Sequence, residues 1–494
     1  MAFIDGSVVS VALPAMQADL DASLRGAQWI VNAYMLTLGA LMLVGGAAGD
    51  RYGRRKMFIL GVLVFGGASI ACGLAPQVGW LVAARALQGI GGALMVPESL
   101  AIISAAFPEK ERGRAIGTWA GFSALTTALG PVLGGYLVDA SSWRTIFFVN
   151  VPLALITLVI ALWHVPESRG EEDHASVDWR GGLLATLGLG AIAYGLTVAS
   201  EVAWSHPLVL GALLAGLVFL AIFVWWERRA PAPMMPLDLF RAREFSGANG
   251  ITLLLYFALS GAMFFVPFEL IGVHGYSAMQ AGAAFLPFTL IMGTLSRWSG
   301  ALIEKYGARW PLTVGPVVVA IGLALLALPG TGSSYWTGYF PAMILMGLGM
   351  AIAVAPLTTV VMRSASERHS GVASGVNNAV SRVAGLLAVA LLGAIAIGHF
   401  RTTLDERLAN EPVPMEVREH MRAEASKLGE AKVPSSLQPA QKQQVTQVLH
   451  ESFLRSVHLV MLICAAMTLL SAVCGWLTMP GPIRRSAPSP ARTG

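Results

Sequence analysis

Long apolar runs, separated by short islands of charged residues, constrain this chain more than any other feature of its sequence. A membrane-spanning helix needs about 20 apolar residues, and runs of that length recur from one end of the sequence to the other. Only 12% of the 494 residues are charged, whereas soluble domains carry roughly 25%. The sequence therefore predicts an all-α polytopic membrane protein rather than a soluble one.

The apolar runs predict about fourteen transmembrane helices. They lie near residues 2–18, 27–48, 57–75, 78–103, 113–138, 145–164, 180–199, 206–226, 246–270, 278–303, 311–328, 335–362, 371–398 and 456–478. A long polar loop, 399–455, separates the last two; it is expected to form surface helices and is assigned no chemistry. An even number of spans places both termini on one side of the membrane.

Basic residues indicate which side that is. With both termini in the cytoplasm, the inner islands, the span ends beside them and the short tail 480–494 hold 20 Lys and Arg residues. The short outer loops hold two, Arg25 and Arg144. Because basic residues concentrate in cytoplasmic loops, we expect a multi-pass protein of the cell (inner) membrane with cytoplasmic termini.

The first span is unusual. Asp5 follows Met1 almost at once, and no basic flank precedes the apolar run. A secretory signal peptide would begin with basic residues and contain no buried acid, so this segment is not one. We expect that the first span has lost its opening residues.

An internal repeat divides the chain. The segment Gly46–Arg55, GAAGDRYGRR, reappears 254 residues later as Gly300–Arg309, GALIEKYGAR. Both copies follow an even-numbered span, so the two halves run parallel, which is the plan of one large transporter class. The predicted organisation is a six-helix half over 1–164, two additional helices with linkers over 165–245, and a second six-helix half over 246–479.

Several motifs carry a family resemblance. Gly46–Arg55 resembles the G-x-x-x-D-R-x-G-R-R/K loop of the major facilitator superfamily, and Arg85–Gly92 resembles its R-x-x-x-G motif. Gly130–Gly135, GPVLGG, resembles the span-five signature of its antiporters. Asp5–Pro14 resembles the first-span motif of the fourteen-span drug:proton antiporters, and Trp143–Pro152 resembles their entry to span six. The resemblance covers nearly the whole chain and implies two parallel six-helix halves, with two extra central helices, around a cavity that opens alternately to each side.

Charged residues inside the predicted spans are candidates for proton coupling, because a charge at the bilayer midplane costs roughly 3 kcal/mol or more. Asp5 is the first candidate, and the alternative is that it acts only as a static partner of Arg85. The resemblance implies a role in proton transfer for Arg85. Glu98 follows Arg85 on the same span and points to a different face at about 100° per residue; it is the third candidate. Glu269, near the outer end of span nine, is expected to reach water.

Other polar and aromatic residues fall on spans that line the cavity in the family. Taken singly, the aromatic side chains fit packing against lipid or the protein core better than contact with a ligand. The candidates for binding substrate are Trp29, Asn32, Tyr34, Gln88, Trp119, Phe122, Asn377, Asn378 and Arg382.

Two motifs are expected to act in the transport cycle. Charges at a helix end can pair with the helix dipole and with partner charges, and the resemblance implies that the cytoplasmic loop latches the halves together; its residues are Gly46, Asp50, Arg51, Gly53, Arg54 and Arg55. In span five, glycines permit close helix contact and proline bends the helix. The resemblance implies that this bend closes the outward path and favours exchange over uptake; the residues are Gly121, Gly130, Pro131, Gly134 and Gly135. The alternatives are a solvated turn and plain packing.

Other classes of function lack their motifs. None of the six lysines is followed by Ser or Thr, so there is no Walker A loop. There is no HExxH or GxSxG sequence, and the three cysteines lack the spacing of metal ligands. We therefore expect no enzyme activity, no cofactor, no metal and no nucleic-acid partner.

The predicted function is export of small molecules, such as drugs, antibiotics or lipophilic toxic compounds, in exchange for protons. The alternatives are an uptake symporter, which the span-five motif disfavours, and an exporter of an endogenous metabolite. A membrane sensor or a membrane enzyme is less favoured, for want of a receiver domain or a catalytic constellation. The expected partners are the substrate, protons and the bilayer, and a periplasmic adaptor protein is unproven. The charge of the substrate stays open, because buried acids favour cations whereas Arg85 and Arg382 favour anions.

Overall fold

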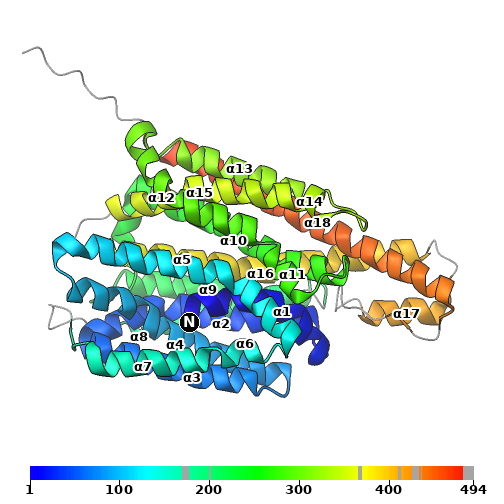
Figure 1. Ribbon diagram of the computed structural model, residues 1–494, viewed down its shortest axis with the longest axis horizontal. Coiled ribbons are helices and arrows are strands. Elements are labelled where there is room, and N and C mark those ends of the chain that lie inside the picture. Colours follow the sequence, from blue (N-terminus) through cyan, green and yellow to red (C-terminus); the bar gives the residue numbers. More distant parts are fainter. Residues whose placement is uncertain are drawn as a thin grey trace, which may run out of the picture.

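The computed structural model describes residues 1–169, 177–199, 202–364, 370–409, 413–424, 433–434 and 437–481, without some of the side chains inside helices, mainly in 109–128 and 296–305. Throughout this part the regular structure is helical, and most helices run along the long axis of the molecule (Figure 1). The prediction of an all-α protein is confirmed.

The first half contains seven helices, one of them short. They are α1 (Ala2–Asp19), α2 (Leu24–Tyr52), α3 (Arg54–Gly73), α4 (Val78–Ala106), α5 (Glu109–Ala140), α6 (Thr145–Phe148) and α7 (Asn150–His164). Two helices and a 3-10 turn follow: α8 (Trp179–Val198), α9 (Pro207–Glu227) and η1 (Leu237–Arg241). Helices α8 and α9 pack against each other, and α8 also contacts α2.

The second half repeats this plan with longer final helices. It contains α10 (Arg243–Gly272), α11 (Ala278–Ala283), α12 (Leu286–Tyr306), α13 (Pro311–Leu325), α14 (Tyr335–Gly338), α15 (Phe340–Arg363), α16 (Ser370–Ala409), α17 (Met415–Glu424) and α18 (Pro439–Thr478). The repeated motif has the same local structure in both halves, because Gly53 ends α2 with φ 113° and Gly307 ends α12 with φ 72°. Glycine adopts such positive φ angles without strain.

Eleven helices of the described chain are long and apolar enough to cross a membrane, and α13 is a shorter apolar helix. All fourteen predicted spans fall on helical segments, but α1 and α5 are not among those eleven. The number fourteen therefore stays a prediction.

The polar region 399–455 is largely helical in its described part, and it projects beyond the rest of the bundle. Helices α16 and α18 continue into it, and α17 lies beside them at one end of the molecule (Figure 1). Arg422 pairs with Asp405 at 2.7 Å, and Arg407 pairs with Glu451. The predicted surface helices are thus largely continuations of the last two spans. We call this end of the bundle the α17 end.

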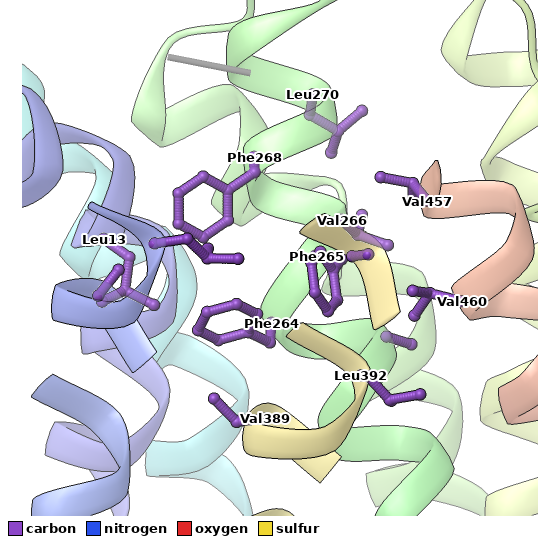
Figure 2. Packing of buried hydrophobic residues seen from close by; sticks show 14 of the residues in the cluster. Leu13, Phe264, Phe265, Val266, Phe268, Leu270, Val389, Leu392, Val457 and Val460 are labelled. Carbon is purple, nitrogen blue, oxygen red and sulfur yellow. The ribbon is translucent and has the colours of Figure 1, made fainter. Parts of the chain in front are cut away.

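The apolar core joins the two halves through α10. Phe264, Phe265 and Phe268 of α10 lie between Leu13 of α1 and Val460 of α18 (Figure 2). All five side chains are at most 3% exposed. Helix α10 is thereby fixed against both halves, close to the α17 end.

Candidate functional site

A buried polar network surrounds Asp5, which lies in the first turn of α1 and is 2% exposed. One carboxylate oxygen, Oδ2, accepts a hydrogen bond from Nη1 of Arg85 at 2.5 Å. The other, Oδ1, accepts from Nε2 of Gln88 at 2.8 Å and from Nδ2 of Asn150 at 3.1 Å. The two amide nitrogens also reach the hydroxyl of Ser69, at 2.7 and 3.1 Å. We call Asp5, Arg85, Gln88, Asn150 and Ser69 the Asp5 cluster.

Arg85 makes further contacts with α2. Its Nε donates to the carbonyl of Ile30 at 3.0 Å, and its guanidinium lies 4.2 Å from the centre of the Tyr34 ring. A second bond from Nη1 reaches Oε1 of Gln88 at 2.6 Å. These contacts help to offset the cost of burying the Arg85 charge, because a buried ion pair is tolerated only when its remaining polar atoms are also hydrogen-bonded.

The Asp5 cluster joins four helices of the first half, and a fifth helix, α2, supplies the Ile30 carbonyl that accepts from Arg85. Its residues come from α1, α3, α4 and α7. Asp5, Arg85, Gln88 and Tyr34 were predicted from the sequence, whereas Ser69 and Asn150 were not. Asn150 stands inside the motif at the entry to span six, which is the one signal that could have found it.

Glu98 lies apart from the Asp5 cluster. It is 1% exposed, and neither carboxylate oxygen has a hydrogen-bond partner among the described residues. Its carboxylate contacts α2 at Gly49, where an added Cβ would come within 2.0 Å of Oε2. Its charged neighbours are Asp50, Arg54 and Glu167. The structure thus places Glu98 beside the loop between α2 and α3.

The remaining substrate candidates of the first half occupy different surroundings. Trp29 packs against Tyr194 of α8, with ring centres 6.4 Å apart, so it faces the additional helices. Asn32 is fully buried, and both of its amide atoms lack a hydrogen-bond partner in the described chain. Trp119 and Phe122 line a largely apolar pocket of about 840 Å³ between α1, α3, α4, α5 and α7.

The candidates of the second half lie on α16. Asn377 donates to Oδ1 of Asn249 at 3.1 Å and to the Thr252 hydroxyl at 2.7 Å, which ties α16 to α10. Asn378 is exposed and donates to the carbonyl of Ser374. Arg382 lies against α2, because a Cβ on Gly39 would stand 3.0 Å from the Arg382 Cβ. The Nε of Arg382 has no partner among the described residues.

The loop between α2 and α3 makes its polar contacts locally. Arg54 donates to Oδ1 of Asp50 from Nε at 3.0 Å and from Nη2 at 2.8 Å. The backbone N–H of Arg55 donates to Glu167 at 3.0 Å, and the Arg51 guanidinium lies 5.5 Å from the Tyr52 ring centre. Gly46 packs against α4, where a Cβ would be 3.5 Å from Pro97. These contacts stay within the first half and the segment after α7, so the latch between the halves stays a prediction.

The span-five glycines bring α5 close to two other helices. A Cβ on Gly130 would lie 1.9 Å from the Ser7 hydroxyl, and one on Gly134 would lie 2.8 Å from Val8, so α5 packs tightly against α1. A Cβ on Gly135 would lie 2.2 Å from the carbonyl oxygen of Ala278. That close approach joins α5 to α11 across the two halves. Gly121 lies on α5, but its surroundings fall outside the described residues.

The second half contributes equally to this junction. A Cβ on Gly282 of α11 would lie 2.1 Å from the carbonyl oxygen of Pro131. The carboxylate of Asp139, on α5, accepts from the backbone N–H groups of Ala278 at 3.1 Å and Met279 at 2.8 Å. Asp139 and Gly282 were not predicted. We call this contact between α5 and α11 the α5–α11 junction.

Helices α2 and α16 form the other long contact between the halves. Nε2 of Gln28 donates to the carbonyl of Val389 at 2.7 Å, and a Cβ on Gly393 would collide with Gln28. Further along, the side chain of Leu43 packs against Gly375, so the contact runs over much of both helices. The halves therefore meet along α2 and α16 and at the α5–α11 junction.

Comparison with known proteins agrees with this architecture. The family profile described as Major Facilitator Superfamily matches residues 1–389. The chain is 33% identical over 491 residues to the multidrug resistance protein Stp of Mycobacterium tuberculosis (strain CDC 1551 / Oshkosh), covering 97% of this chain and 90% of that protein. It is 34% identical over 495 residues to the tetracenomycin C resistance and export protein of Streptomyces glaucescens, covering 99% and 91%.

Solved structures share the fold. The inward-facing, unoccupied bacterial homologue of the human lysosomal transporter Spinster matches with a TM-score of 0.60 and 20% identity, over 99% of this chain and 96% of that one. The xylose transporter XylE from E. coli, in an inward open conformation, matches with a TM-score of 0.56 and 13% identity, over 98% and 96%. The predicted fold is thus confirmed, and the chain belongs to the Major Facilitator Superfamily of membrane transporters, not to an enzyme family.

Proposed function

We propose that this transporter exports small, drug-like molecules across the cytoplasmic membrane in exchange for protons, with both termini in the cytoplasm and the α17 end outside. The names of the two relatives, a multidrug resistance protein and a resistance and export protein, support the export of drugs or antibiotics. The division into halves 1–164 and 246–479, with the additional helices 165–245 between them, is part of the proposal.

The Asp5–Arg85 pair carries the proposal of proton exchange. An intramembrane acid is costly to leave charged, so such residues mark proton pathways or counter-ions. When Asp5 binds a proton, Arg85 loses its anionic partner, although its bonds to Ile30 and Gln88 remain. The freed guanidinium must then find another partner, which favours a rearrangement of α1 against α4.

Exchange follows if the substrate and the proton favour different states of the same cavity. A ligand shifts a conformational equilibrium only by its difference in affinity for the two states. Protonation of Asp5 from the outside would then favour release of the substrate outward, and loss of the proton to the cytoplasm would restore the Asp5–Arg85 pair for the next substrate.

A second candidate function is export of a metabolite that the cell itself makes. The relative from Streptomyces glaucescens is named for both resistance and export of tetracenomycin C, which supports this alternative. Both functions use the same exchange with protons and differ in the substrate alone.

Efflux of ethidium from cells expressing the full chain tests the proposal. We expect wild type to extrude ethidium, Asp5→Asn to abolish extrusion at equal expression, and a protonophore to abolish it in wild type. Asp238→Asn is the matched control, because Asp238 forms an exposed ion pair with Arg241. Extrusion that persists unchanged in Asp5→Asn or after collapse of the proton gradient would overturn proton exchange. Failure of wild type to move ethidium would favour the metabolite exporter.

A further inference from the structure

A second buried acid, Glu269, lies near the α17 end of α10. Its side chain is 0% exposed, so the expectation that it reaches water is wrong. Tyr339, which directly precedes α15 and is also fully buried, donates its hydroxyl proton to Oε1 of Glu269. The other oxygen, Oε2, has no hydrogen-bond partner among the described residues.

Among the described residues, Glu269 has no cationic partner, whereas Asp5 has one. No ion pair of Glu269 occurs in the part of the chain that the structure describes, whereas Asp5 is paired with Arg85. The turn of α10 that carries Glu269 also carries Phe265, Val266 and Phe268 and lies in the apolar core (Figure 2). A carboxylate without a cation in such surroundings carries a large desolvation cost, and binding a proton removes it.

A chain of polar contacts leads from Glu269 toward the α17 end. Nε2 of His274, in the loop after α10, lies 2.7 Å from the Tyr339 hydroxyl. Because Tyr339 has one proton and donates it to Glu269, its oxygen accepts from the Nε2–H of His274. The two rings also meet edge to face, with centres 5.5 Å apart. The contacts hold Glu269, Tyr339 and His274 as one unit, which we call the Glu269 triad.

The outer side of the Glu269 triad faces α18. Burial and the neighbouring His450 lower the pKa of His274, so its imidazole is held neutral and able to pass a proton on. His450 lines a pocket of about 500 Å³ that also contains the exposed residues Lys442 and Gln447. The other titratable groups that face the triad are Tyr276 and, beside it, Tyr335.

We propose that Glu269 is a second proton-binding site of the transporter, loaded from the outside through His274 and Tyr339. A proton from water on the outer side is taken up by His274, whose Nε2–H then passes to the Tyr339 oxygen. The hydroxyl proton of Tyr339 moves at the same time to Oε1 of Glu269. His274 and Tyr339 end neutral and Glu269 ends protonated, so one proton has been taken up. The inference rests on the proposed exchange and adds a site in the second half to Asp5 in the first.

Infrared difference spectroscopy of the purified full-length protein tests proton binding without transport. We expect a carboxylic-acid carbonyl band that appears as the pH is lowered, is lost in Glu269→Gln and persists in Asp5→Asn. Tyr339→Phe should keep the band and slow its appearance, whereas Tyr335→Phe should not, because the Tyr335 hydroxyl bonds the Ala284 carbonyl instead. A band unchanged in Glu269→Gln would overturn the proposal.

Proteoliposomes loaded with ethidium test the role of this proton in exchange. With the membrane potential clamped at zero and a gradient of one pH unit, each coupled proton contributes about tenfold to the limiting ethidium gradient. We expect Glu269→Gln to lower that limit about tenfold and Glu227→Gln, another buried acid, to leave it unchanged. An equal limiting ethidium gradient in Glu269→Gln and wild type would overturn the claim that the Glu269 proton is coupled to transport. If wild type shows no response to the pH gradient, the proposed exchange fails, and the infrared titration still decides proton binding.

Discussion

The α5–α11 junction should control how readily the outer end opens, and Gly135→Ala tests this. The added Cβ would lie 2.2 Å from the carbonyl oxygen of Ala278, whereas ordinary contact begins at 3.4 Å. The Ala278 carbonyl is part of the backbone and cannot swing away as a flexible side chain could. Helices α5 and α11 must therefore separate by about 1.2 Å, the difference between these two distances. Overpacking of this kind costs about 1–3 kcal/mol. Because the contact joins the two halves, the cost falls on the state in which the outer end is closed.

The expected result is a shift toward outer-open states of about 5- to 150-fold, which corresponds to the same 1–3 kcal/mol. Pulsed electron–electron double resonance between spin labels at Ser141 and Gln280, both exposed beside the junction, measures the populations of the outer-open and outer-closed states. The labelled protein would lack Cys72, Cys464 and Cys474. Gly398→Ala is the matched control, because a Cβ there meets nothing within 4 Å. A distance distribution in Gly135→Ala identical to that of the control would refute the reasoning.

Two further predictions follow from contacts at the same end. Asp139→Ala removes the acceptor for two N–H groups of α11 and should weaken the closed state by about 1.5–3 kcal/mol, as for other hydrogen bonds to charged groups; an unchanged distance distribution between the same labels would contradict this. Arg144 lowers the pKa of Asp19, so the stability from this pair is present above the usual carboxyl pKa and is lost as the pH falls through the lowered value. In thermal unfolding, Asp19→Asn should remove this pH-dependent contribution to stability, which is less than about 1 kcal/mol because the pair is partly exposed. An undiminished pH dependence of stability in Asp19→Asn would argue against it.

The helices were largely predictable from hydropathy. The expected span 27–48 became α2 (Leu24–Tyr52), and 180–199 became α8 (Trp179–Val198). Backbone groups in lipid must be bonded within the helix, so a long apolar run has few alternatives. The extensions of α16 and α18 could not be predicted from hydropathy, because these segments are polar and are stabilised by contacts such as Arg422–Asp405.

The sites were predictable only in part. The cost of intramembrane charge identified Asp5 and Arg85, and the structure pairs them. Asn150 is more than 140 residues away from Asp5 in sequence, so a single sequence could not indicate their contact. Glu269 was misjudged because its place near the end of a span suggested water, whereas Tyr339 from the turn between α14 and α15 covers it.

Proton movement on addition of substrate tests the central claim most directly. Purified protein in liposomes containing a trapped pH-sensitive dye would receive ethidium with no proton gradient imposed and the membrane potential clamped. The account predicts that ethidium moving in one direction drives protons in the other through wild type, and that Asp5→Asn abolishes both movements. Ethidium transport through wild type with no accompanying proton movement, or with protons moving in the same direction, would contradict it.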